Sequence, residues 1–196
     1  MLDTLQAWDE ALLLLLNGQP SWLAPVAWLL TSKWATLPVV VLILIQLFAR
    51  RPWKKGLLGL AMFAACVGGT DAISSRLMKP GFGRLRPSHH PQLSEQVHLH
   101  EHADGSVYRG GRFGFVSSHA ANTFGLATLA VLLFGGGPWR WLFGFAALVS
   151  WTRIYLGVHY PGDILFGALF GAGWASALFT LFSRFQRLNS PSAPSP

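Results

Sequence analysis

Three short segments, far apart in the sequence, carry cations, imidazoles, hydroxyls and a carboxylate at the ends of apolar stretches. The first runs over residues 79–87, the second over 116–119 and the third over 153–163. Their polar side chains are Lys79, Arg86, Ser117, Ser118, His119, Arg153, His159 and Asp163. A phosphoryl group in transfer spreads negative charge over its oxygens, and fixed cations neutralise that charge. Set together, these residue types predict a site that breaks a phosphate ester through a phosphohistidine.

His159 and Asp163 lie four residues apart, which is one turn of a helix that begins near Pro161. At that spacing the carboxylate can accept a hydrogen bond from the imidazole Nδ1–H. The bond fixes the tautomer, leaves Nε2 free as a nucleophile and stabilises the positive charge that forms on the ring. His119 then remains as the general acid for the leaving alkoxide. The competing interpretation is a local structural bond at the start of a helix.

The cations Lys79, Arg86 and Arg153 suit phosphate oxygens, because arginine offers a planar fork of donors and lysine a point charge. Two serines, Ser117 and Ser118, come directly before the next helix. Backbone N–H groups at a helix N-terminus bind anions, and hydroxyls add further donors. Both features have simpler interpretations, since cations at span ends often reach toward water and a serine before a helix is often only its N-cap.

The composition is that of a membrane protein, with 52% hydrophobic residues and 12% charged residues. Soluble domains carry about a quarter charged residues. The net charge of +7 comes from Lys and Arg near span ends and in a polar loop, which favours anionic lipids or a phosphorylated substrate as partners over nucleic acid. The single Cys66 excludes an intrachain disulfide. The N-terminus lacks the basic start of a signal peptide, so the first apolar segment is expected to remain in the mature protein.

A membrane-spanning helix needs roughly 20 apolar residues, so 196 residues can hold about six spans. Five spans are predicted over residues 34–48, 53–78, 118–134, 139–155 and 161–182. Two shorter apolar runs, 7–16 and 22–31, predict an interfacial helix and a short first span. The expected fold is an all-α, polytopic membrane helix bundle with about six transmembrane helices, forming a single domain over residues 1–188, with a disordered tail over 189–196.

Lys and Arg near span ends predict the orientation. The tightest basic cluster is expected on the cytoplasmic side; it consists of Arg50, Arg51, Lys54 and Lys55. Alternation of the spans then places the three polar segments together on the opposite side, facing the periplasm or the outside. The polar stretch over residues 79–117 joins two spans on that side and is expected to cover the site as a loop or lid.

Together the three motifs resemble the type 2 phosphatidic acid phosphatase family. The family's first motif, a lysine separated by six residues from Arg-Pro, is similar to residues 79–87. Its second motif, Pro-Ser-Gly-His, is similar to residues 116–119, with Val and Ser replacing Pro and Gly. Its third motif, Ser-Arg followed by His and Asp, is similar to residues 152–163, with Thr152 in place of the serine. The resemblance covers roughly residues 71–163. It implies His159 as nucleophile, His119 as general acid, Asp163 as the orienting carboxylate, phosphate binding by Lys79, Arg86, Ser117, Ser118 and Arg153, and no metal or other cofactor.

The resemblance also implies an integral membrane phosphatase of a lipid phosphate or pyrophosphate, at the outer surface of a bacterial inner membrane. Undecaprenyl pyrophosphate is the first expected substrate, because small bacterial members of the family often recycle that carrier. Phosphatidylglycerol phosphate, phosphatidic acid and lipid A are alternatives. A phosphotransferase that passes phosphate to a lipid acceptor is a second enzyme class. A lipid-binding or transport protein with an inactive site is disfavoured, since neither nucleophile nor acid is missing.

Other polar features have less specific interpretations. Asp71 lies inside a predicted span and is expected to pair with Arg76, Lys79 or a later cation. Three loop histidines alternate along the chain, so that an extended strand would present them on one side as metal ligands, although exposed loop histidines are the simpler interpretation; they are His98, His100 and His102. The remaining loop arginines either steer an anionic headgroup or solvate the loop; they are Arg84, Arg109 and Arg112.

Overall fold

The structure, a computed structural model, describes residues 2–49 and 52–188, and these form an all-helical membrane bundle. Within the described residues the extended pairing consists of two isolated bridges, Leu85 with Phe113 and Glu101 with Val107. The expected fold class is therefore confirmed. The predicted tail over 189–196 lies outside the described residues, as do Arg50 and Arg51 of the basic cluster.

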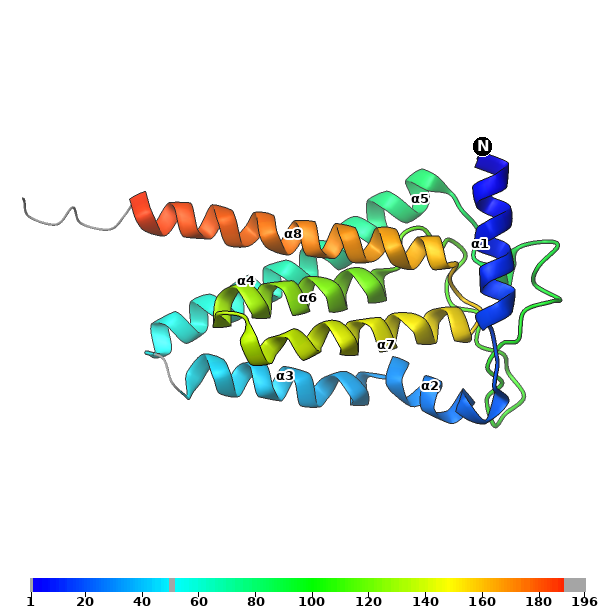
Figure 1. Cartoon of the computed structure of the whole chain (residues 1–196), viewed down its shortest axis with the longest axis horizontal. Coiled ribbons are helices and arrows are strands. Elements are labelled where there is room, and N and C mark those ends of the chain that lie inside the picture. The colour runs from blue at the N-terminus through cyan, green and yellow to red at the C-terminus, as the bar shows by residue number, and fades with distance from the viewer. Residues whose placement is uncertain (1, 50–51, 189–196) are drawn as a thin grey trace, which may run out of the picture.

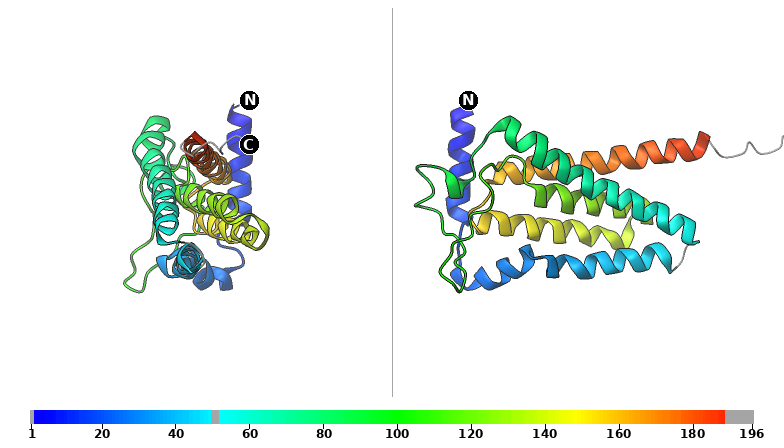
Figure 2. Two further views of the ribbon diagram at one scale, coloured as in Figure 1. Left: turned by 90° about the vertical axis from the view of Figure 1, so that its left-hand side faces the viewer. Right: turned by 180° about the vertical axis from the view of Figure 1, so that it is seen from behind.

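Four long helices follow the spans predicted from the sequence and run side by side in Figures 1 and 2: α4 (Trp53–Ile73), α6 (Ser118–Phe134), α7 (Trp141–Tyr155) and α8 (Pro161–Leu188). The ends of α6 agree with the prediction, because Ser117 caps its start and Gly135, with φ of +87°, ends it in the left-handed conformation. The last helix continues six residues beyond the predicted end at 182.

Two helices that the sequence separates lie end to end. A single turn over Ser21–Leu23 leads into α2 (Ala24–Thr31), which meets α3 (Lys33–Phe48) at a bend of 46°. The eight residues of α2 extend only about 12 Å, too short for a hydrocarbon core of about 30 Å, whereas both helices together are long enough. The expectation of two separate spans over 22–31 and 34–48 is therefore corrected to one bent unit.

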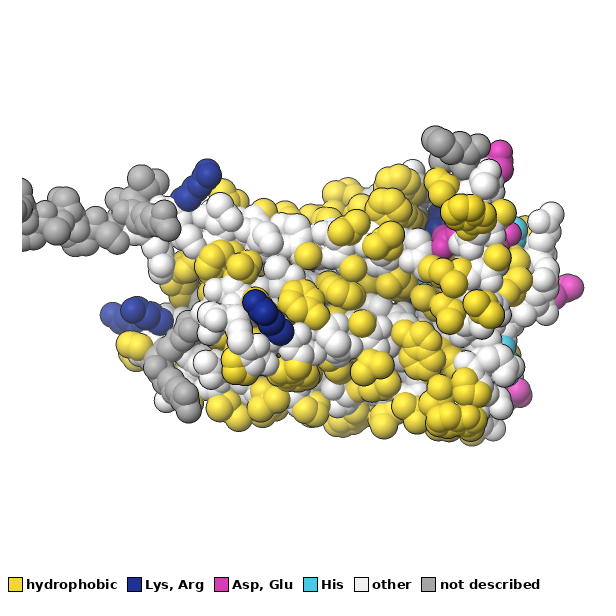
Figure 3. Space-filling model, viewed as in Figure 1, with side chains coloured by type: hydrophobic (Ala, Val, Ile, Leu, Met, Phe, Trp, Pro, Cys, Tyr) yellow, Lys and Arg dark blue, Asp and Glu magenta, His cyan; other side chains and the backbone are white. Residues whose placement is uncertain are grey.

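By length and composition, two helical stretches are sufficient to cross a membrane: Trp53–Phe82, which includes α4, and Pro161–Gln186. The bent α2–α3 unit raises the number to three, and Ser118–Phe134 is a shorter apolar helix. An apolar surface covers the middle of the bundle in Figure 3, with basic side chains toward one end and acidic and histidine side chains toward the other. This distribution is that of a protein embedded in a bilayer.

The N-terminal helix α1 (Leu2–Leu16) lies across one end of the bundle and packs against α7 and α8 (Figures 1 and 2). Leu13 is buried against the bundle, whereas other large apolar side chains of the helix are exposed; they are Leu5, Trp8, Leu12, Leu14 and Leu15. An amphipathic helix in this orientation lies in the interfacial layer of a membrane. The predicted interfacial N-terminal helix is present, and the structure adds that it lies at the end of the bundle where the three polar motifs meet.

Small residues bring α6 and α8 into close contact. A Cβ on Gly125 would lie 3.2 Å from the carbonyl oxygen of Gly171, and a Cβ on Gly171 would collide with the backbone of Ala121. Such small residues allow membrane helices to approach each other closely. The contact continues to the polar end, where the backbone N–H of Ser117 donates to the carbonyl of Asp163 at 3.0 Å. The second and third motifs are thus held together by the packing of these two helices.

The segment between α5 (Lys79–Phe82) and α6 folds over this end of the bundle. Backbone bonds pair its two ends, with Arg86 N–H donating to Arg112 and Gly114 N–H donating to Arg84. Asn17, which is buried, ties the middle of the segment to the bundle, because its amide donates to the carbonyls of His98 and Tyr155 at 2.9 and 2.8 Å. The predicted polar loop is therefore an ordered cover.

Candidate active site

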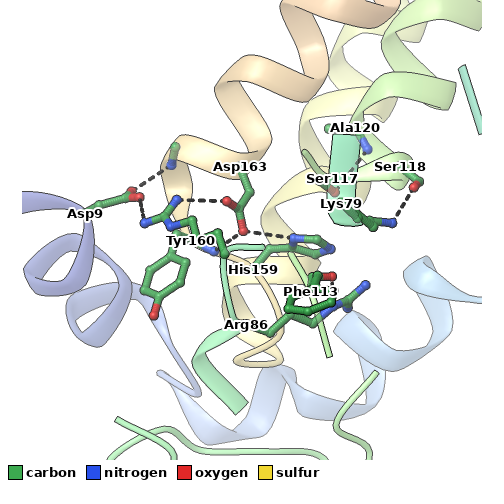
Figure 4. A network of polar contacts seen from close by, with 12 residues as sticks. Asp9, Lys79, Arg86, Phe113, Ser117, Ser118, Ala120, His159, Tyr160 and Asp163 are labelled. Atoms are coloured by element: carbon green, nitrogen blue, oxygen red, sulfur yellow. Dashed lines mark hydrogen bonds and ion pairs between the residues drawn. The ribbon is translucent and has the colours of Figure 1, made fainter. Parts of the chain in front are cut away.

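The polar residues of the three motifs lie at one end of the bundle, where several helix ends meet. Figure 4 shows six of them there: Lys79, Arg86, Ser117, Ser118, His159 and Asp163. The first motif follows α4, the second opens α6, and the third runs from the last turn of α7 into the first turn of α8. Alternating helix directions place these ends together, as the sequence argument required. The catalytic and phosphate-binding roles of the residues remain predictions.

The third motif forms a buried histidine–carboxylate pair. Nδ1 of His159 lies 3.1 Å from Oδ2 of Asp163, and the same oxygen accepts a hydrogen bond from the backbone N–H of Tyr160 at 3.2 Å. Both side chains are almost fully buried, with 1% and 0% exposure. Pro161 begins α8, and Asp163 lies in its first turn, where a negative charge is favourable. This geometry directs the Nδ1–H toward the carboxylate and leaves Nε2 as the free ring nitrogen.

The environment of His159 favours the neutral imidazole. Burial lowers the pKa of His159 well below its usual value, and the nearby cations Arg86, Arg153 and Lys79 lower this pKa further. An unprotonated ring nitrogen is the form that can attack phosphorus. The same cations would interact favourably with a phosphate group bound beside the ring.

Gly114 of the covering loop packs directly on this pair. A Cβ at this position would lie 2.8 Å from Oδ2 of Asp163 and 3.3 Å from Cγ of Arg86. Only a residue without a side chain fits there while the neighbours keep their places. The cover therefore excludes water from the His159–Asp163 bond, which strengthens it electrostatically.

Lys79 and Ser118 are hydrogen bonded to each other. Nζ of Lys79 donates to Oγ of Ser118 at 2.6 Å, and Oγ of Ser74 lies 2.8 Å from the same hydroxyl. A π-helical turn over Ser74–Met78 interrupts the helix directly before Lys79, a distortion that is frequent at functional sites. Ser118, which replaces the glycine of the family pattern, thus holds Lys79 through its hydroxyl.

Arg86 is buried, with 7% exposure, and its Nε donates to the carbonyl of Phe113 at 3.1 Å. Burial and the neighbouring positive charge of Arg153 lower the pKa of Arg86 to about 10. The guanidinium is therefore still charged at neutral pH. Two cations buried near each other repel, and an anion between them relieves that repulsion.

Arg153, with 1% exposure, is held from two sides. One terminal nitrogen donates to the hydroxyl of Thr31 at the end of α2, and the other donates to the Tyr108 hydroxyl of the covering loop at 2.8 Å. Its Nε is buried and has no hydrogen-bond partner within the part of the chain that the structure describes. A buried donor without a partner is costly, and a phosphate oxygen would satisfy it.

Ser117 is the N-cap of α6, the simpler of the two roles expected for it. Its hydroxyl accepts a hydrogen bond from the backbone N–H of Ala120 at 3.4 Å, which makes it the N-cap of α6. The cap orients the first turn of the helix, from which the half-buried His119 projects. The N-cap interpretation is thus correct, and an anion at the same helix end is compatible with it.

A groove of about 390 Å³ opens beside His119, between the bend of α2–α3 and helices α4, α6 and α7. Its walls combine apolar side chains of α3, α4, α6 and α7 with polar ones that include Lys33 and Asp71. The residues that line it are Thr31, Ser32, Lys33, Thr36, Val40, Val67, Asp71, Ser118, His119, Asn122, Thr123, Leu126, Phe145 and Val149. Two of these residues accept hydrogen bonds from the site cations, Ser118 from Lys79 and Thr31 from Arg153. A groove that joins apolar side chains to such a polar end can hold a molecule with one apolar end and one anionic end.

Two of the less specific expectations turn out differently. Asp71 lines the groove and forms no direct ion pair among the described residues, although its charge interacts with that of Lys79 over a longer distance. Arg84 neither steers a headgroup nor solvates the loop, because it forms ion pairs with Asp9 and Asp163. The loop did not need to be solvated there, since the interfacial helix covers it.

The loop histidines pack as aromatic rings. His100 stacks on Trp28 with ring centroids 4.0 Å apart, and His102 meets the same indole edge-on at 5.2 Å. Tyr108, which holds Arg153, joins this cluster. Over residues 2–49 and 52–188, no group of three His, Cys, Asp or Glu side chains is arranged to hold a metal ion. Burial and the neighbouring histidines lower the pKa of His100, which is consistent with stacking as a neutral ring.

Several residues that build the site carry no local sequence signal. Thr31 and Tyr108 hold Arg153 from 122 and 45 residues away, and Asp9 reaches Arg84 over 75 residues. Gly114 lies outside the three motifs. Asn17 lies in a turn-forming run that follows the first apolar segment. The sequence indicates the turn but not the hydrogen bonds of Asn17 to the covering loop.

The chain is similar in sequence and in structure to known proteins. The family model described as "PAP2 superfamily" matches residues 53–187. The chain is 33% identical to a lipid A 4'-phosphatase of Porphyromonas gingivalis over 193 residues, covering 95% of this chain and 80% of that protein. It is 37% identical to a lipid A 4'-phosphatase of Bacteroides thetaiotaomicron over 183 residues, covering 89% of this chain and 77% of that protein.

Two further similarities concern other substrates. A match of 41% identity to an undecaprenyl-diphosphatase of Sulfolobus acidocaldarius extends over 69 residues, which is 34% of this chain and 32% of that protein. Among solved structures, the transmembrane PAP2-type phosphatidylglycerolphosphate phosphatase from Bacillus subtilis is similar with a TM-score of 0.62 and 28% identity. That similarity covers 97% of this chain and 90% of the solved one.

Proposed function

Because this chain belongs to the PAP2 superfamily and is a membrane lipid phosphatase of that superfamily, we propose that it hydrolyses a phosphomonoester on a glycolipid of the lipid A type. The observation that carries the catalytic part is the buried His159–Asp163 pair, surrounded by Lys79, Arg86 and Arg153. The substrate class rests on the two lipid A 4'-phosphatases, which match over more than three quarters of their length.

The proposed reaction has two steps. Nε2 of His159 attacks phosphorus, the bond from phosphorus to the leaving oxygen breaks, and His119 donates a proton to that oxygen. Asp163 stabilises the positive charge on the ring through the Nδ1–H. Water then attacks the phosphohistidine, His119 accepts its proton, and inorganic phosphate leaves. The cations and the unpartnered Nε of Arg153 stabilise the charge on the phosphoryl oxygens in both steps. None of these steps uses a metal ion.

The groove beside His119 supports a lipid substrate. It begins at the first turn of α6, where the phosphoryl site lies, and continues between apolar side chains of α3, α4 and α7. Acyl chains in this groove would leave the headgroup phosphate beside His119. Binding energy from the lipid tail can then be used to position the phosphate.

The order of the lipid candidates differs from the one based on sequence motifs alone. Undecaprenyl pyrophosphate, first in that order, is supported by a match to about a third of one diphosphatase. It remains the second candidate, followed by phosphatidylglycerol phosphate, the substrate named for the structural relative. Transfer of the phosphate to a lipid acceptor is the competing reaction class, and it uses the same phosphohistidine.

A headgroup panel distinguishes these candidates. Protein purified in detergent is expected to release inorganic phosphate fastest from a lipid A bisphosphate, with kcat/KM at least about tenfold above undecaprenyl pyrophosphate and phosphatidylglycerol phosphate, a difference of about 1.4 kcal/mol in transition-state binding. Mass analysis of the product locates the phosphate lost. Preference for the pyrophosphate would restore the motif-based order.

The panel includes two controls. Activity is expected to persist in excess EDTA and to be inhibited by vanadate, which mimics the trigonal-bipyramidal phosphoryl group. Loss of activity in EDTA would contradict the metal-free mechanism. Addition of an acceptor lipid tests transfer, because a transferase would form a phosphorylated lipid at the expense of free phosphate.

The orientation in the membrane is also proposed: the site faces the periplasm of a bacterial inner membrane. Ala103 in the covering loop and Lys54 at the opposite end are both exposed. In a Cys66→Ala background, a cysteine at position 103 is expected to react with an impermeant maleimide added to spheroplasts, whereas a cysteine at position 54 reacts only after permeabilisation. The reverse pattern would place the site in the cytoplasm and make the substrate an inner-leaflet lipid.

A further inference from the structure

Arg84 lies behind the His159–Asp163 pair. Its Nη1 donates to Oδ1 of Asp163 at 2.8 Å, while the other carboxylate oxygen faces His159. The guanidinium also lies over the ring of Tyr160, with Cζ 3.9 Å from the centroid. Each oxygen of Asp163 therefore has its own partner, and Arg84 holds the one that the histidine does not use.

The interfacial helix α1 holds Arg84 in turn. Nη2 of Arg84 donates to Oδ2 of Asp9 at 2.7 Å and to Oε1 of Gln6 at 2.8 Å. Figure 4 shows Asp9 of this helix on the same side of the site as Tyr160 and Asp163. Oδ1 of Asp9 accepts from the backbone N–H of Gly162 at 2.7 Å, in the first turn of α8. A Cβ at Gly162 would lie 2.7 Å from Asp9, so glycine permits this approach. One carboxylate thus fixes both Arg84 and the start of the helix that carries Asp163.

We propose that Arg84 is a positioning residue for the catalytic pair and that Asp9 holds it in place, which makes α1 a part of the active site. The inference rests on the role of His159 in the proposed function. Arg84 lines a different groove from the one beside His119, together with Leu5 and Trp8 of α1. It is therefore placed to act through Asp163 and not on the substrate.

The role can be measured with para-nitrophenyl phosphate, a small ester that does not depend on the lipid preference. Arg84→Gln is expected to lower kcat about 10- to 100-fold and to leave KM within about twofold, because a carboxylate that can rotate no longer orients the imidazole. Arg84→Lys keeps the charge but loses the fork, so partial recovery is expected. Asp9→Asn should show a smaller loss of the same kind. Arg140→Gln, which removes an exposed arginine at the opposite end of the bundle, is the matched control and should change nothing.

A double-mutant cycle separates positioning from general destabilisation. In an Asp163→Asn background, Arg84→Gln is expected to lower kcat less than about twofold, because the carboxylate through which Arg84 acts is already changed. Equal losses in both backgrounds would overturn the proposal. A rise in KM with unchanged kcat would do the same, since it would make Arg84 a substrate ligand.

A second readout needs no substrate. In protein labelled with ¹⁵N-histidine in detergent micelles, the ring signals of His159, assigned with His159→Asn, are expected to show one Nδ1–H tautomer. Arg84→Gln should convert them to a mixture, whereas Arg140→Gln should leave them unchanged. Unchanged signals in Arg84→Gln would overturn the proposal even if the enzyme is active. A tautomer shift in a protein that hydrolyses no phosphate ester would instead reject the proposed function and retain the role of Arg84.

Discussion

Replacement of His159 by alanine is expected to reduce phosphate release at least about 10³-fold and to abolish the covalent phosphoenzyme. The ring is the proposed nucleophile, and among the residues that the structure describes no other imidazole of the site is hydrogen bonded to a carboxylate. Loss of a nucleophile removes the covalent route altogether, so the remaining rate reflects only the fixed cations. Two quantities are measured: kcat with a lipid phosphate, and the ³²P that a labelled substrate leaves bound to the protein. Bound ³²P that survives base treatment and is lost in acid identifies a phosphohistidine.

Asp163→Asn serves as the graded comparison. It keeps the nucleophile and removes the charge that stabilises the imidazolium, so a smaller loss than in His159→Ala is expected. His90→Ala, which removes a half-buried histidine of the covering loop, is the control for protein quality and should retain wild-type activity. Full activity in His159→Ala, with the protein folded, would eliminate the phosphohistidine mechanism and leave the cation cluster as a binding site.

The fold was predictable wherever local chemistry fixes the chain. The start of α6 follows from Ser117 as its N-cap, and its end follows from a glycine that takes up the left-handed conformation. The start of α8 at Pro161 has the same local origin. The end-to-end arrangement of α2 and α3 was not predictable in this way. The sequence around Ser32 indicates only that one helix ends and another begins, and the direction of the second helix depends on what it packs against.

The same distinction between local and long-range contacts holds for the candidate site. His159 and Asp163 are one helical turn apart, so their hydrogen bond was encoded in the spacing. The partners of Arg84 were not, since Asp9 lies on a helix that the sequence places only at the membrane surface. The packing of Gly114 against Asp163 likewise depends on how a loop of more than 30 residues folds back over the bundle. Contacts of this kind, between segments far apart in the sequence, depend on tertiary structure, and short motifs do not predict them.

His119→Ala is expected to separate substrates by their leaving groups. In the proposed first step His119 donates a proton to the leaving oxygen, and a lipid alkoxide needs that proton far more than a nitrophenolate does. Hydrolysis of a lipid phosphate should therefore fall about 10²- to 10⁴-fold, the usual contribution of a general acid. With para-nitrophenyl phosphate the first step should survive. The second step should slow, because the same imidazole activates the attacking water.

The distinguishing observation is a burst. When His119→Ala is mixed rapidly with para-nitrophenyl phosphate, nitrophenolate should appear in an amount close to one equivalent per enzyme and then slowly, while phosphohistidine accumulates on His159. The double variant His119→Ala with His159→Ala is the control and should show no burst. Equal losses with both substrates and no burst would contradict the acid–base role. His119 would then act only by lining the phosphoryl end of the groove, where its ring meets the first turn of α6, and the proton for the alkoxide would have to come from water.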